Sequence, residues 1–74
     1  MVSYNPLYLQ VKDELLKRIA DGVYNPGELI PSESALAADF GVSISTIRQS
    51  VSILVSEGIL EKKQGKGTFV IKRS

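Results

Sequence analysis

The sequence predicts a small, mainly α-helical domain that ends in a small antiparallel β hairpin. Three stretches with a helical spacing of apolar residues fill residues 7–57, and each is bounded by residues that commonly begin or end helices. Two β-prone runs around a glycine-rich turn follow in residues 59–72. The 74 residues suffice for one domain around a single small core, in the order helix, short strand, two helices and two strands.

The first helix is expected from about Leu7 to Asp21. Asn5 is the expected N-cap and Pro6 the expected first helical residue, because a proline at that position loses no backbone hydrogen bond. Gly22 follows at the position where helices commonly end with a left-handed residue. The expected buried stripe consists of Val11, Leu15, Leu16, Ile19 and Ala20.

A turn and a short strand are expected between the first two helices. Tyr24–Gly27 is a typical turn sequence, because Pro26 restricts φ and Gly27 tolerates the positive φ that follows. Glu28–Ile30 is too short for a helix, and Pro31 disfavours a helical backbone in the residue before it. The segment is therefore expected to add one short strand.

The second helix is expected over residues 33–40, with Ser32 as its N-cap and Gly41 at its end. Ala37 supplies a small side chain where two helices approach closely, and Gly41 supplies the backbone freedom that a tight turn needs. The core shared with the next helix is expected to contain Leu36, Ala37, Phe40, Val42 and Ile47. A short helix, a tight turn and a second helix form a helix-turn-helix, which we predict for residues 33–51.

The third helix is expected to begin after its N-cap Ser43 and to end near Glu57, before Gly58. A helical wheel places four apolar residues on its core side: Ile47, Val51, Leu54 and Val55. The same wheel directs other residues away from the core or to the flanks: Ser45, Gln49, Ser52, Thr46 and Arg48. No acidic residue lies between Gly41 and Ser56.

The outer face of this helix suits contact with the edges of bases in double-stranded DNA. An arginine can donate to guanine O6 and N7, a glutamine can pair with adenine, and serine or threonine can contact bases or phosphates. We therefore predict that Ser45, Thr46, Arg48 and Gln49 bind DNA in the major groove. The alternative is an ordinary amphipathic helix with a solvated polar face.

The hairpin is predicted from Ile59–Lys63 and Thr68–Lys72, which flank the turn Gln64–Gly67. Its glycines let the backbone approach a narrow groove or a phosphate closely, and its lysines add attraction that is independent of sequence and sensitive to salt. The predicted DNA-contacting residues here are Lys63, Gln64, Gly65, Lys66 and Gly67. A solubilised hairpin with a permissive turn is the alternative.

Charge and composition narrow the class of function. The net charge is +1, but residues 1–40 carry three basic and six acidic side chains, and residues 41–74 carry six basic and two acidic ones. The basic half is a weak indication of a polyanionic partner. The chain has no cysteine and no histidine, so thiol or histidine catalysis is excluded, and no enzymatic activity, metal or cofactor is expected. No signal peptide or membrane span is predicted, and a cytoplasmic location is expected.

An ordered set of short motifs across residues 5–71 resembles one family. The motifs are Pro6-Leu7-Tyr8, Gln10, Gly22, Pro26-Gly27, Pro31-Ser32-Glu33, Leu36-Ala37, Gly41-Val42-Ser43, Thr46-Ile47-Arg48, Leu54, Glu57-Gly58 and Gly65-Lys66-Gly67-Thr68-Phe69-Val70. Together they resemble the N-terminal domain of GntR-family transcription regulators. This resemblance implies a winged helix-turn-helix that binds a palindromic operator as a dimer, with the third helix in the major groove and the hairpin, or wing, at the minor groove.

The resemblance also implies positions that contact DNA. They fall here on Ser34, Ile44, Ser45, Thr46, Arg48, Gln64 and Gly65. Ser34 and Ile44 stand where many members carry arginine, so the operator sequence and affinity of other members do not transfer to this chain. The wheel places Ile44 toward the core, although as the first helical residue it could overhang and touch a thymine methyl group.

Regulators of this family have a C-terminal domain that binds a small-molecule effector and dimerises, and that domain is expected to be absent from this chain. We therefore expect the isolated domain to dimerise weakly and to bind its operator weakly. Two other functions are compatible with the sequence, namely a winged helix used for protein–protein contact and non-specific architectural binding of DNA.

Overall fold

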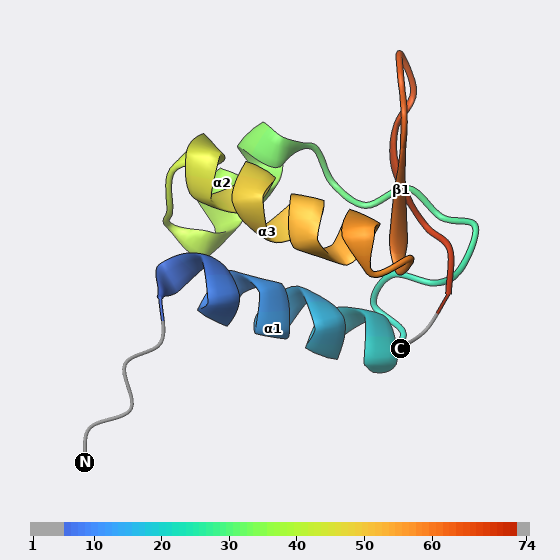
Figure 1. Cartoon of the computed structure of the whole chain (residues 1–74), viewed down its shortest axis with the longest axis horizontal. Helices are drawn as coiled ribbons and strands as arrows, with labels where there is room; N and C mark the ends of the chain where they lie inside the picture. The colour runs from blue at the N-terminus through green and yellow to red at the C-terminus, as the bar shows by residue number, and fades with distance from the viewer. Residues whose placement is uncertain (1–5, 73–74) are drawn as a thin grey trace.

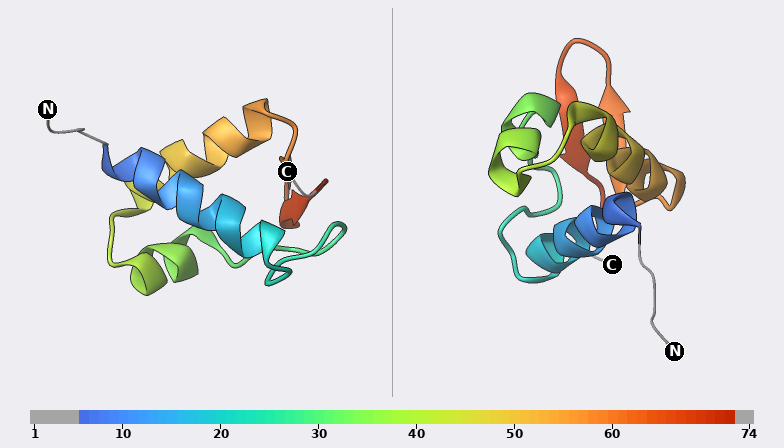
Figure 2. Two further views of the ribbon diagram at one scale, coloured as in Figure 1. Left: turned by 90° about the horizontal axis from the view of Figure 1, so that it is seen from below. Right: turned by 90° about the vertical axis from the view of Figure 1, so that its left-hand side faces the viewer.

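The computed structural model describes residues 6–72 and confirms the predicted fold class. Three helices, α1 (Leu7–Ala20), α2 (Glu33–Phe40) and α3 (Ile44–Ser56), precede the strands β1 (Leu60–Lys63) and β2 (Gly67–Val70). Helix α1 lies along α3, and α2 packs against α3 (Figure 1). The β1–β2 hairpin projects beyond the three helices, as the right-hand view of Figure 2 also shows. The hairpin therefore stands out from the helical body as a wing does.

Helix α1 begins at Leu7, as predicted, but Pro6 has a different place from the expected one. Pro6 is its N-cap, with ψ at 148°, rather than its first helical residue, and Asn5 lies outside the described residues. The Pro6 carbonyl accepts hydrogen bonds from the amides of Leu9 and Gln10, which starts the helix without a side-chain cap. The helix ends at Ala20, and Gly22 follows in the left-handed region with φ at +82°. The end is thus as predicted, within one residue.

The segment between α1 and α2 makes less sheet than predicted. The Glu28 amide donates to the Asn25 carbonyl at 2.9 Å, so the turn lies one residue further along than expected. The expected strand Glu28–Ile30 is reduced to a single antiparallel bridge between Leu29 and Phe69. Backbone hydrogen bonds still hold the segment against β2, because the Ile30 amide donates to the Thr68 carbonyl and the Glu28 carbonyl accepts from the Val70 amide, each at 2.9 Å.

The helix-turn-helix has the predicted caps. The Ser32 hydroxyl accepts from the Ala35 amide, and the Ser43 hydroxyl accepts from the Thr46 amide, each at 3.1 Å. Gly41 ends α2 with φ at +70°, as the tight turn requires. Helix α3 ends at Ser56, one residue before the predicted end. These local contacts set the start and direction of α3.

One core unites the helices, the bridging segment and the hairpin. Its buried apolar side chains are Val11, Leu15, Ile19, Ile30, Leu36, Ala37, Ile47, Val51, Leu54, Ile59, Leu60 and Val70. The predicted residues Leu16, Phe40, Val42 and Val55 are half-buried against this cluster. Ala20 is exposed, so its prediction as a core residue was wrong: it lies at the last turn of α1, beside the exposed Asp21.

Two polar contacts fix the positions of the helices. The fully buried Ser50 hydroxyl on α3 lies 2.6 Å from the carbonyl oxygen of Tyr8 on α1 and 2.9 Å from that of Thr46, and its single proton is shared between these two acceptors. Arg18 on α1 donates to the Asp39 carboxylate on α2 at 2.7 Å, and its guanidinium lies 4.4 Å from the centre of the Phe40 ring. The hydrogen bond to Asp39 raises the pKa of Arg18 above its ordinary value. Helices α1, α2 and α3 are thus joined by hydrogen bonds as well as by the core.

Candidate nucleic-acid interface

The N-terminal half of α3 presents the polar face that the helical wheel predicts. Ile47 is buried, whereas Ser45, Arg48 and Gln49 are exposed. Thr46 is half-buried, and its hydroxyl lies 3.0 Å from the Ser43 hydroxyl at the start of the helix. The face therefore offers hydroxyl, amide and guanidinium groups to a partner.

Two neighbouring residues complete the surface around the start of α3. Ser34 is exposed in the first turn of α2. Ile44 is 40% exposed, so the wheel's assignment of Ile44 to the core side was wrong. The buried side of α3 begins only at Ile47, and the first helical residue lies beyond the part of the helix that the core covers. An exposed Ile44 is free to make an apolar contact.

The tip of the hairpin is the second part of the surface. The register runs from Leu60 opposite Val70 to Lys63 opposite Gly67, so residues 64–66 form the turn. All residues from 63 to 67 are exposed. Gly67 has φ at +126°, and a Cβ added there would lie 2.9 Å from the Leu29 side chain, which leaves little room for any other residue. The glycines thus shape a tip whose backbone and lysines are accessible.

A groove separates the hairpin from the start of α2. Residues 29–33 line one side and residues 62–68 line the other. The Glu33 carboxylate lies in this lining and makes two ion pairs. Its Oε1 accepts from Arg48 Nε on α3 at 3.1 Å, and its Oε2 lies 3.4 Å from Lys62 Nζ on β1. Glu33 therefore joins the outer face of α3 to the hairpin.

The environment of Glu33 favours its charged form. Burial opposes ionisation, but the hydrogen bond from Arg48 and the charge of Lys62 outweigh it and lower the pKa of Glu33 below its ordinary value. Glu33 was not among the residues that the sequence predicted for the candidate site. No local signal identifies these pairs, because Arg48 lies 15 residues away and Lys62 lies 29 residues away.

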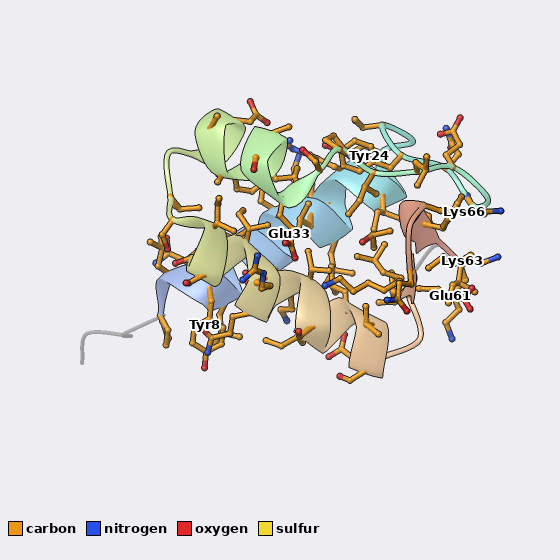
Figure 3. The ribbon with its side chains drawn as sticks, turned by 90° about the horizontal axis from the view of Figure 1, so that it is seen from above. Tyr8, Tyr24, Glu33, Glu61, Lys63 and Lys66 are labelled. Carbon is orange, nitrogen blue, oxygen red and sulfur yellow. The ribbon has the colours of Figure 1, made fainter. Side chains whose placement is uncertain are left out.

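The structure brings the two predicted surfaces together through this carboxylate. Figure 3 shows Glu33 between α2 and α3, with Lys63 and Lys66 on the hairpin. Lys63 Nζ lies 5.3 Å from the centre of the Phe69 ring, within the range of a cation–π contact. Glu33 thus links the exposed face of α3 to the hairpin that carries these lysines.

Residues 6–72 contain neither a cluster of metal-ligating side chains nor a membrane-spanning helix. No three histidine, cysteine, aspartate or glutamate side chains gather there as the ligands of a metal ion would. None of the helices in that range is both long and apolar enough to cross a membrane.

Comparison with known proteins identifies the family. The family model described as bacterial regulatory proteins, gntR family, matches residues 7–70. The chain is 46% identical over 69 residues to the mannosyl-D-glycerate transport/metabolism system repressor MngR of Escherichia coli strain K12, covering 93% of this chain and 29% of that protein. It is 43% identical over 67 residues to the transcriptional repressor NagR of Bacillus subtilis strain 168, covering 90% of this chain and 28% of the relative. The chain therefore spans less than a third of the length of these relatives.

Solved structures give the same result. The N-terminal domain of AraR, in complex with the mutant ORR3, superposes with a TM-score of 0.87 at 45% identity, over 93% of this chain and 99% of that chain. The DNA-binding domain of AraR, in complex with operator ORX1, superposes with a TM-score of 0.86 at 45% identity, over 93% and 86% of the two chains. The family consists of regulators, which confirms that the chain is not an enzyme. The chain belongs to the GntR family of bacterial regulatory proteins and has the winged-helix fold of that family's DNA-binding domain.

Proposed function

We propose that this chain is the sequence-specific DNA-binding domain of a bacterial transcription regulator. Helix α3 enters the major groove and the tip of the hairpin lies at the minor groove. The observation that carries this proposal is the Glu33 carboxylate, which pairs with Arg48 on α3 and with Lys62 on β1 and so holds both contact surfaces side by side. The similar AraR domains, each in complex with its operator, support the same function.

Each proposed contact residue has a distinct role. On α3, Arg48 and Gln49 read base edges, Ser45 and Thr46 contact bases or phosphates, and the exposed Ile44 meets a thymine methyl group. On α2, Ser34 contacts a phosphate, because its exposed hydroxyl lies in the first turn of the helix. At the tip of the hairpin the contact residues are Lys63, Gln64, Gly65, Lys66 and Gly67, whose cations and accessible backbone suit phosphates and a narrow groove.

We also propose a larger context for the domain. The relatives named as repressors are more than three times as long as the matched segment, so this domain is expected to act within a longer regulator. In that regulator a second domain would bind a small-molecule effector and would dimerise, which suits a palindromic operator. The protein would act as a repressor, in the cytoplasm, where the bacterial chromosome lies.

Selection of duplexes from a random pool tests the function directly. The 74-residue chain is expected to enrich a defined sequence, and its affinity for that duplex is expected to fall steeply as salt rises. Two results would contradict the proposal. Equal affinity for the enriched duplex and for a scrambled duplex would indicate architectural binding, and no binding at low salt would indicate a protein-interaction module.

A further inference from the structure

We propose that Glu33 is a positioning residue of the DNA-binding surface, which directs the guanidinium of Arg48 toward a base and holds Lys62 away from the phosphates. This inference rests on the proposed function and adds a source of specificity to it. A carboxylate on a surface that meets DNA reduces the attraction to phosphate, so its presence there calls for a compensating role. The contacts of Glu33 supply that role.

The first contact leaves the recognition edge of Arg48 free. Glu33 accepts from Nε, and within residues 6–72 no other nitrogen of Arg48 has an acceptor at hydrogen-bond distance. A guanidinium has two donor edges, and the outer pair of nitrogens is therefore available for guanine O6 and N7. The Arg48 side chain is 62% exposed and would otherwise sample many rotamers. Glu33 is the more buried partner, with 25% of its side chain exposed, so the carboxylate serves as the fixed point for the arginine.

The second contact restrains a lysine that would otherwise add non-specific affinity. The Lys62 ammonium lies at the other oxygen of the same carboxylate, although the Lys62 side chain is 55% exposed. Lys62 lies on β1 in the lining of the groove, directly before Lys63. Removal of Glu33 would release this ammonium to contact a phosphate on any sequence. The carboxylate thus lowers binding to all sequences while it favours the one that Arg48 reads, and such a difference increases specificity.

The test compares Glu33→Ala and Glu33→Gln with the unchanged chain, on the duplex enriched from a random pool and on a scrambled duplex of equal length. For Glu33→Ala we expect a roughly tenfold loss of preference at the base pair that Arg48 reads. This loss is a part of the base discrimination that a bidentate arginine contact supplies. We expect the same variant to bind the scrambled duplex more tightly, with a salt slope steeper by about 0.9 because one more phosphate is neutralised. Glu33→Gln keeps an acceptor for Nε, so it is expected to retain more of the base preference than Glu33→Ala.

Glu61→Gln is the matched control. Glu61 is an exposed carboxylate on β1 that makes no ion pair within residues 6–72. Its removal changes the net charge of the hairpin region by the same amount and is expected to leave the base preference unchanged. Circular dichroism confirms that each variant is folded, and the nearly isosteric Glu33→Gln keeps the test usable if Glu33→Ala is unstable.

A double-mutant cycle isolates the role of Lys62. Lys62→Met keeps most of the aliphatic side chain and is expected to change the salt slope little while Glu33 is present. In the Glu33→Ala background, the same substitution is expected to abolish the added slope. An equal effect of Lys62→Met in both backgrounds would overturn the restraint of Lys62 by Glu33.

The outcomes separate this inference from the proposed function. If Arg48→Ala lowers the base preference but both Glu33 variants preserve it, the positioning role of Glu33 is wrong and the DNA-binding function stands. If a Glu33 variant weakens binding to both duplexes equally, its effect is structural, and the positioning role is again wrong. If no duplex is enriched at all, the proposed function itself fails.

Discussion

The buried hydroxyl of Ser50 provides a sharp test of how the fold positions α3. Ser50 is fully buried, and it donates across the α1–α3 interface to the Tyr8 carbonyl at 2.6 Å. Its second acceptor, the Thr46 carbonyl at 2.9 Å, belongs to the same helix as Ser50. Ser50→Ala removes both contacts with the loss of one oxygen atom and leaves the backbone of α3 able to remain helical.

The expected magnitude follows from what each group loses. A typical intramolecular hydrogen bond contributes about 1 kcal/mol net to the free energy of unfolding. The two carbonyls are main-chain helical groups that keep their helical partners, so no fully unpaired buried group results and the larger penalty of about 3 kcal/mol does not apply. Alanine is the better helix former by about 0.5 kcal/mol, which masks part of the loss. We expect Ser50→Ala to lower the free energy of unfolding by about 1–1.5 kcal/mol more than a serine-to-alanine change at an exposed position of α3.

Ser52→Ala supplies that comparison, because Ser52 lies in the same helix and is exposed. It gains the same helix propensity without losing a buried contact. Unfolding by heat and by urea, followed by circular dichroism, measures the difference, and 1 kcal/mol shifts the melting temperature of a domain of this size by roughly 4–8 °C. If Ser50→Ala proves as stable as Ser52→Ala, the interhelical hydrogen bond does not hold α3 against α1, and this reasoning is refuted.

Four further predictions concern the contact surface and its support. Arg48→Ala is expected to cost roughly 1–3 kcal/mol of affinity for the selected duplex and to relax the base preference at one position. Fluorescence anisotropy with base-pair variants of the duplex measures both quantities. If the substitution changes neither, Arg48 does not belong to the recognition surface. Lys66→Ala is expected to weaken binding to all duplexes about equally and to reduce the salt slope by about one, whereas a selective loss on one sequence would mean that the hairpin reads bases. Gly67→Ala is expected to lower the free energy of unfolding by roughly 1–3 kcal/mol, because φ is +126° and the added carbon would lie 2.9 Å from the Leu29 side chain. A melting curve like that of the unchanged chain would contradict this close approach of Leu29 to Gly67. The pKa of Glu33 is lowered in the folded chain, so its charged form stabilises the fold above the unfolded pKa, near 4.5, and this contribution is lost as pH falls through the folded pKa. The difference in unfolding free energy between the unchanged chain and Glu33→Gln should therefore shrink below about pH 4.5. A difference that stays constant with pH would contradict the ion pairs.

Local signals in the sequence accounted for most of the fold. Ser32 and Ser43 cap the helices as predicted, and Gly41 makes the turn between them, because each acts through its own backbone and its nearest neighbours. The two β-prone runs around a glycine-rich turn also located the hairpin, with each strand end within one or two residues of its predicted position. The differences arose where the surroundings outweighed a local preference. Pro6 became an N-cap instead of the first helical residue, and the expected strand before α2 shrank to one bridge at Leu29.

The sequence by itself therefore determined the elements, the family and the polar face of α3, since periodicity, caps and glycine positions are properties of neighbouring residues. Only the tertiary structure decided how the contact groups are arranged. It exposed Ile44, placed Glu33 between Arg48 and Lys62, and linked α3 to α1 through Ser50. These contacts join residues 15, 29 and 42 positions apart, and such separations carry no periodic or local signal. Packing of the shared core brings those side chains within hydrogen-bond distance.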